Sequence, residues 1–183
     1  MEAHTAAGKL QGLKDDAPWY EAAFVVGVTN ALNVAADGLA AAWPPLDDTT
    51  AGPEAAAVFA DVRRFYGSAD VPAPLRVIAR DPAYLADVWG AVKRAFDDRR
   101  LTRRHKEALA FAVSLTTRSA FGLAFHLGEL RRLGVSERGV MEVVGVAQMF
   151  SSYTKIADTL QLESDMAHIA PADASGVPDA DGG

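Results

Sequence analysis

The chain has 183 residues, half of them apolar and dominated by alanine and leucine, so it suits one helical domain and is too short for two. It contains no cysteine, which excludes disulfides, thiolate metal sites and thiol redox catalysis. Its formal charge is −6, but five acidic residues gather between Glu163 and Asp181, so the preceding body is nearly neutral and offers no general field for nucleic acid.

Four helices are predicted in the first half of the chain, over about 18–42, 54–66, 73–79 and 82–96. The first carries apolar residues at helical spacing from Phe24 to Leu39, and Trp43-Pro44-Pro45 ends it. The fourth begins with Asp81 as N-cap and Pro82 as its first helical residue.

Further helices are predicted in the second half of the chain, over about 103–116 and 120–133. Another is predicted to begin at Ser136, and a final one covers about 151–162. Thr102, Ser119 and Ser136 are the expected N-caps, and Gly134 is an expected left-handed C-terminal residue. No segment shows a sustained period-two alternation. The sequence therefore predicts an all-α bundle.

The ordered domain is expected over residues 17–163, between a loosely ordered N-terminus at 1–16 and an acidic, disordered tail at 164–183. No apolar run reaches the roughly 18 to 20 residues that span a bilayer, and Met1 to Leu10 lacks the features of a secretory signal. We expect a cytoplasmic protein that does not enter a membrane.

Glu107 and His126 are the candidate catalytic residues. Each lies in a mostly apolar helical segment, and only Thr117 and Arg118 join the two segments, which predicts an antiparallel pair. Glu107 precedes the joint by ten residues and His126 follows it by eight, so at about 1.5 Å per residue both side chains reach similar heights. We expect them to meet.

Two interpretations of such a pair are open. A carboxylate and an imidazole in contact could exchange a proton near neutral pH, as acid/base catalysis requires. They could equally form a hydrogen bond that only holds two helices in register. Ser119 adds a hydroxyl at a helix N-terminus, where free N–H groups favour an anion.

Glu107, the small-polar "AVS" run, a helix break, and His126 seven residues after Ser119 resemble the signature of the alkylhydroperoxidase D-like and carboxymuconolactone decarboxylase superfamily. "MFSSYTKIADTL", from Met149 to Leu160, is similar to the closing helix of its peroxidase-related members. The resemblance covers roughly residues 101–162 and implies the alkylhydroperoxidase D-like helical bundle.

In redox members of that superfamily a Glu, a Cys-x-x-Cys pair and a His form the peroxidatic centre. The resemblance places these positions at Glu107, Ser119, Gly122 and His126, so both thiols are missing here. A serine cannot pass through sulfenic acid to a disulfide, and glycine offers no resolving group. The sequence thus argues against a thiol peroxidase.

What remains resembles the non-redox side of the superfamily, whose decarboxylases act on small carboxylated lactones by proton transfer. The resemblance implies cofactor-free chemistry of decarboxylase, lyase or hydrolase type. Ser119 and Arg118 are the candidate contacts to a substrate carboxylate; the alternative roles are an N-cap for Ser119 and a surface loop residue for Arg118. Tyr153, on the closing helix, is a candidate further donor, with core packing as its default role.

Two alternative functions stay open. One is a non-catalytic, oligomeric ligand-binding or scaffold protein, in which Glu107 and His126 only tie two helices. The other is a hydrolase similar to the group I haloacid dehalogenases, suggested by "VPAPLRVIARDPAYLADVWGAV", with Asp81, Asp87 or Glu107 activating water. The internal duplication of that family is not visible in this chain.

The run from Arg99 to Lys106 carries five cations and is interpreted as a solvated corner or a subunit salt-bridge site, because no aromatic platform for nucleic acid interrupts it. The four histidines are scattered without HxxxH or HxH spacing, so no metal site is predicted. Ala-rich faces and the resemblance together imply a homo-oligomer, either a dimer, a trimer or a hexamer.

Overall fold

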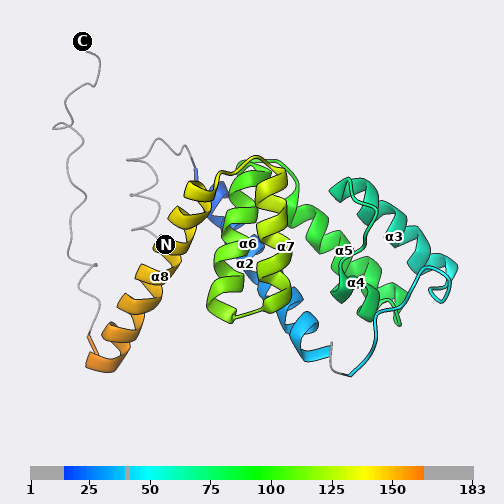
Figure 1. The fold of residues 1–183 in the computed structure, drawn as a ribbon, viewed down its shortest axis with the longest axis horizontal. Coiled ribbons are helices and arrows are strands. Elements are labelled where there is room, and N and C mark those ends of the chain that lie inside the picture. The colour runs from blue at the N-terminus through cyan, green and yellow to red at the C-terminus, as the bar shows by residue number, and fades with distance from the viewer. Residues whose placement is uncertain (1–14, 40–41, 163–183) are drawn as a thin grey trace, which may run out of the picture.

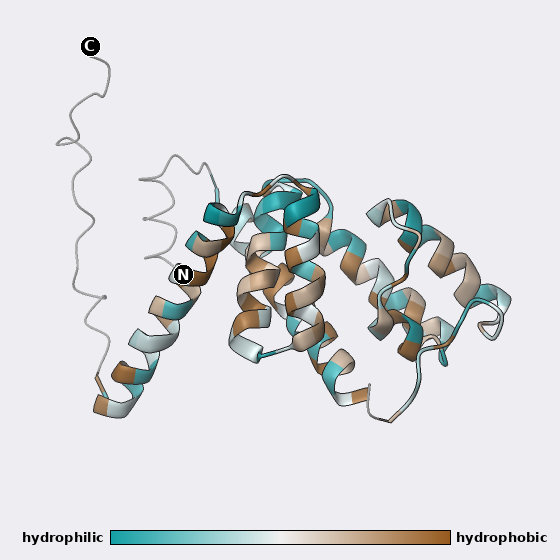
Figure 2. Cartoon of the chain, viewed as in Figure 1, coloured by the Kyte–Doolittle hydropathy of each residue, from teal (hydrophilic) through white to brown (hydrophobic). Residues whose placement is uncertain are grey.

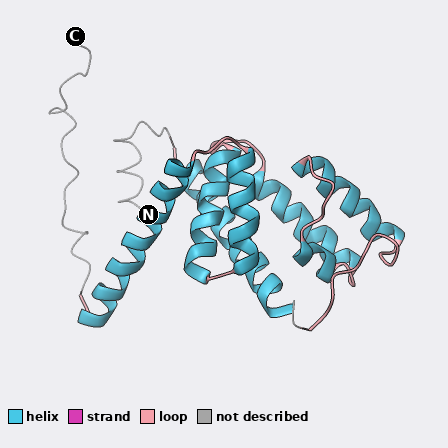
Figure 3. Ribbon diagram, in the orientation of Figure 1, coloured by secondary structure: helices cyan, strands magenta, loops and turns pink. Residues whose placement is uncertain are grey.

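The computed structural model describes residues 15–39 and 42–162, and within them every regular element is an α-helix (Figures 1 and 3). The helices are α2 (Ala17–Leu39), α3 (Pro53–Tyr66), α4 (Ala73–Ile78), α5 (Pro82–Phe96), α6 (Arg103–Thr117), α7 (Ala120–Arg132) and α8 (Glu137–Leu160). The predicted all-α class is confirmed. Of the loose start expected over residues 1–16, residues 1–14 lie outside the described residues, as does the acidic tail expected at 164–183.

The helix boundaries follow local capping chemistry. The Asp81 side chain accepts from the backbone N–H of Tyr84 at 3.0 Å, and Ser119 accepts from that of Gly122 at 3.1 Å. Thr102 and Ser136 cap α6 and α8 in the same way. Gly134, with φ of 75°, adopts the left-handed conformation that glycine tolerates. These predicted caps are confirmed.

Helix α2 lies at the centre of the bundle and packs against α4, α5, α6 and α7. It buries Val25, Thr29, Asn33 and Ala36, a row displaced by one residue from the apolar stripe expected from the sequence. Phe24 of that stripe is exposed. The displacement brings polar side chains into the interior. Asn33 can be buried there because it donates hydrogen bonds to side chains of α6.

Among the described helices, α2 is the one that is long and apolar enough to cross a membrane by length and composition. The sequence-based expectation differed because it considered only uninterrupted runs of apolar residues. Small and weakly polar residues interrupt such a run in α2 but lower the mean hydropathy of the helix only slightly. Core helices of soluble proteins pass the same test. Helix α2 contacts four other described helices and buries Thr29 and Asn33, while 22% of its apolar window is buried.

Helix α8 corrects one prediction. The sequence suggested separate helices from Ser136 and over 151–162, but Glu137–Leu160 forms one continuous helix. Serine at 151 and 152 does not cap a new helix there. Instead the Ser152 hydroxyl donates to the carbonyl of Gln148 at 2.9 Å, and Thr154 does the same to Phe150 at 2.9 Å. Such bonds to the preceding turn are compatible with an uninterrupted helix.

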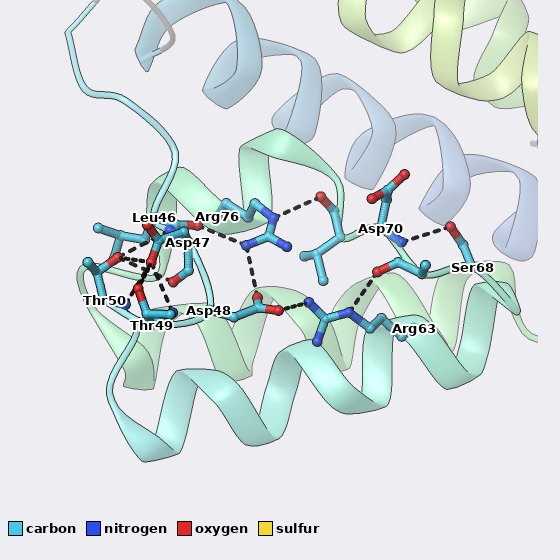
Figure 4. A network of polar contacts seen from close by, with 11 residues as sticks. Leu46, Asp47, Asp48, Thr49, Thr50, Arg63, Ser68, Asp70 and Arg76 are labelled. Carbon is cyan, nitrogen blue, oxygen red and sulfur yellow. Dashed lines mark hydrogen bonds and ion pairs between the residues drawn. The ribbon is translucent and has the colours of Figure 1, made fainter.

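The loop before α3 is fixed by charges on the outside of the bundle (Figure 4). Asp47 accepts from the hydroxyl and backbone N–H groups of Thr49 and Thr50, which lower its pKa to about 2. Asp48 lies between Arg63 of α3 and Arg76 of α4, and the Arg76 guanidinium is 3.1 Å from it. This outer network, Asp48 with Arg63 and Arg76, ties the loop to two helices.

Candidate functional site: a buried charge chain between two helices

Helices α6 and α7 run antiparallel, side by side (Figure 1), joined through Arg118, which has a left-handed φ of 59°. Across this pair His126 Nδ1 lies 2.7 Å from Glu107 Oε2. Both side chains are almost completely buried. The expected meeting of Glu107 and His126 is confirmed, and their catalytic role remains a prediction.

The pair is part of a longer chain of charges, which we call the buried charge chain: His126, Glu107, Arg103, Glu129 and Arg132. The second oxygen of Glu107 accepts from Arg103 Nε at 2.6 Å, and Arg103 Nη2 reaches Glu129 at 3.4 Å. Arg132 closes the chain with two bonds to Glu129, at 3.0 and 2.7 Å. Every carboxylate in this chain therefore has a cationic partner, as buried charges require.

Aromatic rings enclose the centre of the buried charge chain. The Arg103 guanidinium lies over Phe65, Tyr66 and Phe96, at 4.7, 5.0 and 5.2 Å from the ring centroids. Phe96 also stacks on the imidazole of His126 at 5.9 Å. Burial, together with the negative charge of Glu107, raises the pKa of Tyr66 and keeps its phenol protonated. Arg103 and His126 thus sit between aromatic rings, whereas Arg132 at the end of the chain is 47% exposed.

Ser119 and Gly122, the two positions that the resemblance assigns to the missing thiols, have different surroundings. The Ser119 hydroxyl caps α7 and lies 3.3 Å from Asp37 of α2. A Cβ atom at Gly122 would overlap both Ser114 Oγ and Asn33 Oδ1. Asn33 is held there by 3.1 Å bonds from its amide nitrogen to Ser114 and Thr117. The Asn33 amide therefore fills space that a side chain at position 122 would need.

The space beside His126 is small. A cavity of about 20 Å³ is lined by Asn33, Tyr66, Phe96 and Phe125 together with His126 and six further side chains, nearly all apolar. A water molecule needs about 10–15 Å³ of such volume, so the cavity has room for a single water. No lactone or haloacid fits into it.

The remaining candidates lie elsewhere. Arg118 is exposed and lines a surface hollow with Ser151, Ser152 and Lys155. Tyr153 is 60% exposed on α8. Neither lines the cavity beside His126. The structure thus brings Glu107 and His126 together, keeps Ser119 as a cap, and places Arg118 and Tyr153 on the surface.

Asp81 and Asp87 do not join the site either. Asp81 is occupied as the N-cap of α5, and Asp87 is exposed on that helix. Within the described residues, no group of three or more His, Asp or Glu side chains could hold a metal ion.

Sequence reasoning missed Arg103 and Glu129 as members of the chain. The interpretation of Arg99 to Lys106 as a solvated corner is wrong for Arg103, whose side chain is 11% exposed, and for Lys106, which is fully buried 3.2 Å from Glu21. Burial opposes ionisation of Glu21, but hydrogen bonds from the backbone of Leu101 and Arg100 and from Lys106 outweigh it and lower its pKa. The sequence contains one indication of the Arg103–Glu107 ion pair. Arg103 precedes Glu107 by four residues, which places the two side chains on the same helix face.

Comparisons with known proteins agree with this geometry. Residues 82–162 match the Carboxymuconolactone decarboxylase family. The chain is similar in structure to the alkylhydroperoxidase AhpD core from Rhodospirillum rubrum, with 26% identity and a TM-score of 0.66, over 70% of this chain and 97% of that one. No curated protein matches its sequence. The chain is therefore a cysteine-free protein with the alkylhydroperoxidase D-like fold, whose residues 82–162 match the model of the carboxymuconolactone decarboxylase family.

Proposed function

We propose that this chain is a non-catalytic scaffold or binding protein, in which the buried charge chain ties α6 to α7. The observation that carries the proposal is the cavity of about 20 Å³ beside His126, which has room for a water molecule but not for a substrate. An enzyme site needs solvent-connected space beside its reacting groups. The imidazole of His126 instead packs against the rings of Phe96 and Phe125.

The partners of each polar group support the same proposal. Glu107 uses one oxygen for His126 and the other for Arg103, and Ser119 is engaged as a cap. A general base must reach a substrate proton directly or through one water. Since Glu107 is fully buried and bonded on both oxygens, its geometry fits a structural role.

A second candidate is acid/base chemistry on a small carboxylate, and one observation favours it. His126 lines the cavity while its Nδ1 is fixed by Glu107, so Nε2 is the ring atom left for a proton transfer. The family name suggests carboxymuconolactone as the first compound to test. This candidate requires the aromatic wall around His126 to open.

Glu107→Gln separates the two candidates, with the exposed Glu54→Gln as a matched control. For a structural tie, wild-type protein does not accelerate decarboxylation of carboxymuconolactone or dehalogenation of small haloacids. Glu107→Gln then lowers the urea midpoint far more than Glu54→Gln, because it removes the carboxylate partner of Arg103 from a buried ion pair. Nuclear magnetic resonance of the His126 imidazole shows no shift when the lactone is added.

The opposite result would overturn the proposal. Turnover by wild-type protein that disappears in folded Glu107→Gln, and persists in Glu54→Gln, would assign the pair to catalysis. A saturable shift of the His126 imidazole signal with the lactone would show that the wall opens.

A further inference from the structure

A surface hollow lies between the C-terminal end of α6, the joint to α7 and the middle of α8. Its volume is about 570 Å³, within the range of roughly 300–1,000 Å³ that small-molecule sites occupy. Two cations line it, Arg118 at the joint and Lys155 on α8, and no carboxylate of the described residues does. The hollow shares no lining residue with the cavity beside His126, so what it binds is independent of any catalytic role of His126.

The two cations of the hollow have no partner within the protein. Most lysine and arginine side chains of the described residues contact a carboxylate or a backbone carbonyl. Within residues 15–39 and 42–162, those that contact neither are Arg94, Arg118, Arg131 and Lys155. Only the second and fourth of these line the hollow. Like charges in one hollow repel each other, and an anion bound between them would remove that repulsion.

The backbone at Arg118 is unusual for an arginine. It ends α6 with φ 59° and ψ 31°, and its N–H donates to carbonyls of the last turn of that helix. Residues other than glycine rarely adopt this left-handed conformation, because their Cβ comes close to the following carbonyl oxygen. Glycine would form the same turn with less strain. The turn therefore does not require an arginine, and its exposed side chain is left for a role outside the turn.

The wall of the hollow on α8 is a row of polar side chains. Gln148, Ser151, Ser152 and Lys155 are spaced by three, one and three residues, which places them on one face of the helix. Polar and apolar residues are interspersed along α8 as a whole (Figure 2). The Ser152 hydroxyl already donates to the carbonyl of Gln148 at 2.9 Å. The side-chain amide of Gln148 and the hydroxyl of Ser151 remain as neutral donors beside Lys155.

Exposure divides the lining of the hollow into two parts. The polar side chains, including Arg118 and Lys155, are exposed. Leu115, Val144 and Ala147, which are apolar, are only partly exposed. The hollow thus has an apolar base below a cationic rim. A ligand that matches both parts carries negative charge next to a short hydrocarbon portion.

We propose that this hollow binds a small organic anion with two negative charges. Arg118 and Lys155 bind the charged oxygens, and the apolar base contacts the hydrocarbon portion. The guanidinium presents two parallel N–H groups to two oxygens, whereas the ammonium acts as a point charge. A dicarboxylate and an organic phosphate share this chemistry, and the experiment separates them.

The test is a titration of the full chain with glutarate and with phenyl phosphate at low salt, followed by the backbone amide signals in nuclear magnetic resonance spectra. Saturable shifts are expected at Arg118 and at residues 148–155. Acetate, which carries one charge, should bind about tenfold more weakly or worse, because it leaves one cation without a charge-assisted hydrogen bond. Tighter binding of glutarate would identify a dicarboxylate site, and tighter binding of phenyl phosphate a phosphate site.

Arg118→Gly and Lys155→Gln should each weaken binding of the dianion about tenfold or more. The urea midpoint of Arg118→Gly should not fall, because glycine suits the left-handed backbone at this position. Arg94→Gln is the matched control, since it removes an exposed cation without a partner from α5 and should bind as wild type does. The proposal is overturned if neither dianion gives saturable shifts, if both variants bind as tightly as wild type, or if Arg94→Gln loses as much affinity as they do.

Discussion

Two charge networks in this molecule have a similar arrangement of charges, but one is buried and the other is exposed to solvent. In the buried charge chain, Arg103 lies between Glu107 and Glu129, and its side chain is 11% exposed behind three aromatic rings. In the outer network, Asp48 lies between Arg63 and Arg76, and its side chain is 53% exposed. Each network sets one charge between two of opposite sign.

The difference in burial decides what each network contributes. Charges in water are screened and lose little when a partner is removed, whereas a buried charge without a partner cannot recover its solvation. The outer network therefore positions a loop, while the packing of α6 on α7 depends on the buried members of the chain, His126, Glu107, Arg103 and Glu129, more than on Arg132, whose side chain is 47% exposed. The predictions below test this contrast.

Arg103→Met is expected to have the largest effect. The change leaves Glu107 and Glu129 near each other in the core without the cation between them, which should cost about 3–5 kcal/mol of unfolding free energy in urea. Arg63→Met, which removes the equivalent cation from a partly exposed site, is the matched control and should cost much less. Equal losses from the two variants would refute the contrast.

Gly122→Ala is expected to destabilise the protein by about 1–3 kcal/mol, because the added methyl group overlaps Ser114 and Asn33 in a packed interior. Gly128→Ala lies on the same helix with no atom near its added Cβ, and it should gain about 0.5–1 kcal/mol from helix propensity. Urea midpoints for both variants measure the difference. If Gly122→Ala were as stabilising as Gly128→Ala, the packing of Asn33 against α7 would be wrong.

The two networks also differ in how far the sequence predicts them. The approach of Glu107 to His126 follows from a short connection and a fixed rise per residue, both of which are local properties. Arg103 could not be separated from its solvated neighbours, because its burial depends on rings brought in by α3 and α5. Asn33 reaches Gly122 from a helix distant in the sequence.

The helix boundaries, too, were predictable only where they depend on residues close in the sequence. N-caps such as Asp81 and Ser119 were predictable because each cap depends on a residue three positions away. Ser151 and Ser152 lie inside a continuous helix, where the Ser152 hydroxyl donates to the carbonyl of Gln148 in the preceding turn. Residue type alone therefore does not distinguish a cap from a helix interior.

Asp61 on α3 gives an intermediate case and a pH dependence. Hydrogen bonds from Lys93 and Trp89, at 2.7 Å each, lower its pKa below the usual value of 3.8. A carboxylate with a lowered folded-state pKa stabilises the protein above its unfolded-state pKa, and this contribution is lost as the pH falls through the folded-state value. Asp61→Asn should therefore lower the urea midpoint at about pH 7, and this deficit should shrink as the pH falls below the usual carboxyl value of 3.8 toward the folded-state pKa. A constant difference across this range would contradict the assignment.

Asp48→Asn is expected to have the smallest effect. Its hydrogen bond with Arg63, followed by that with Arg76, lowers the pKa of Asp48, but the carboxylate is open to solvent on the outside of the bundle (Figure 4). At about 1 M salt the Debye length falls to about 3 Å, so the difference in urea midpoint between wild type and Asp48→Asn should shrink toward zero. The deficit of Arg103→Met should persist in the same salt, because Arg103 and Glu107 are shielded from solvent ions. If salt removed both deficits equally, the two networks would share one dielectric environment, and the contrast drawn from their burial would fail.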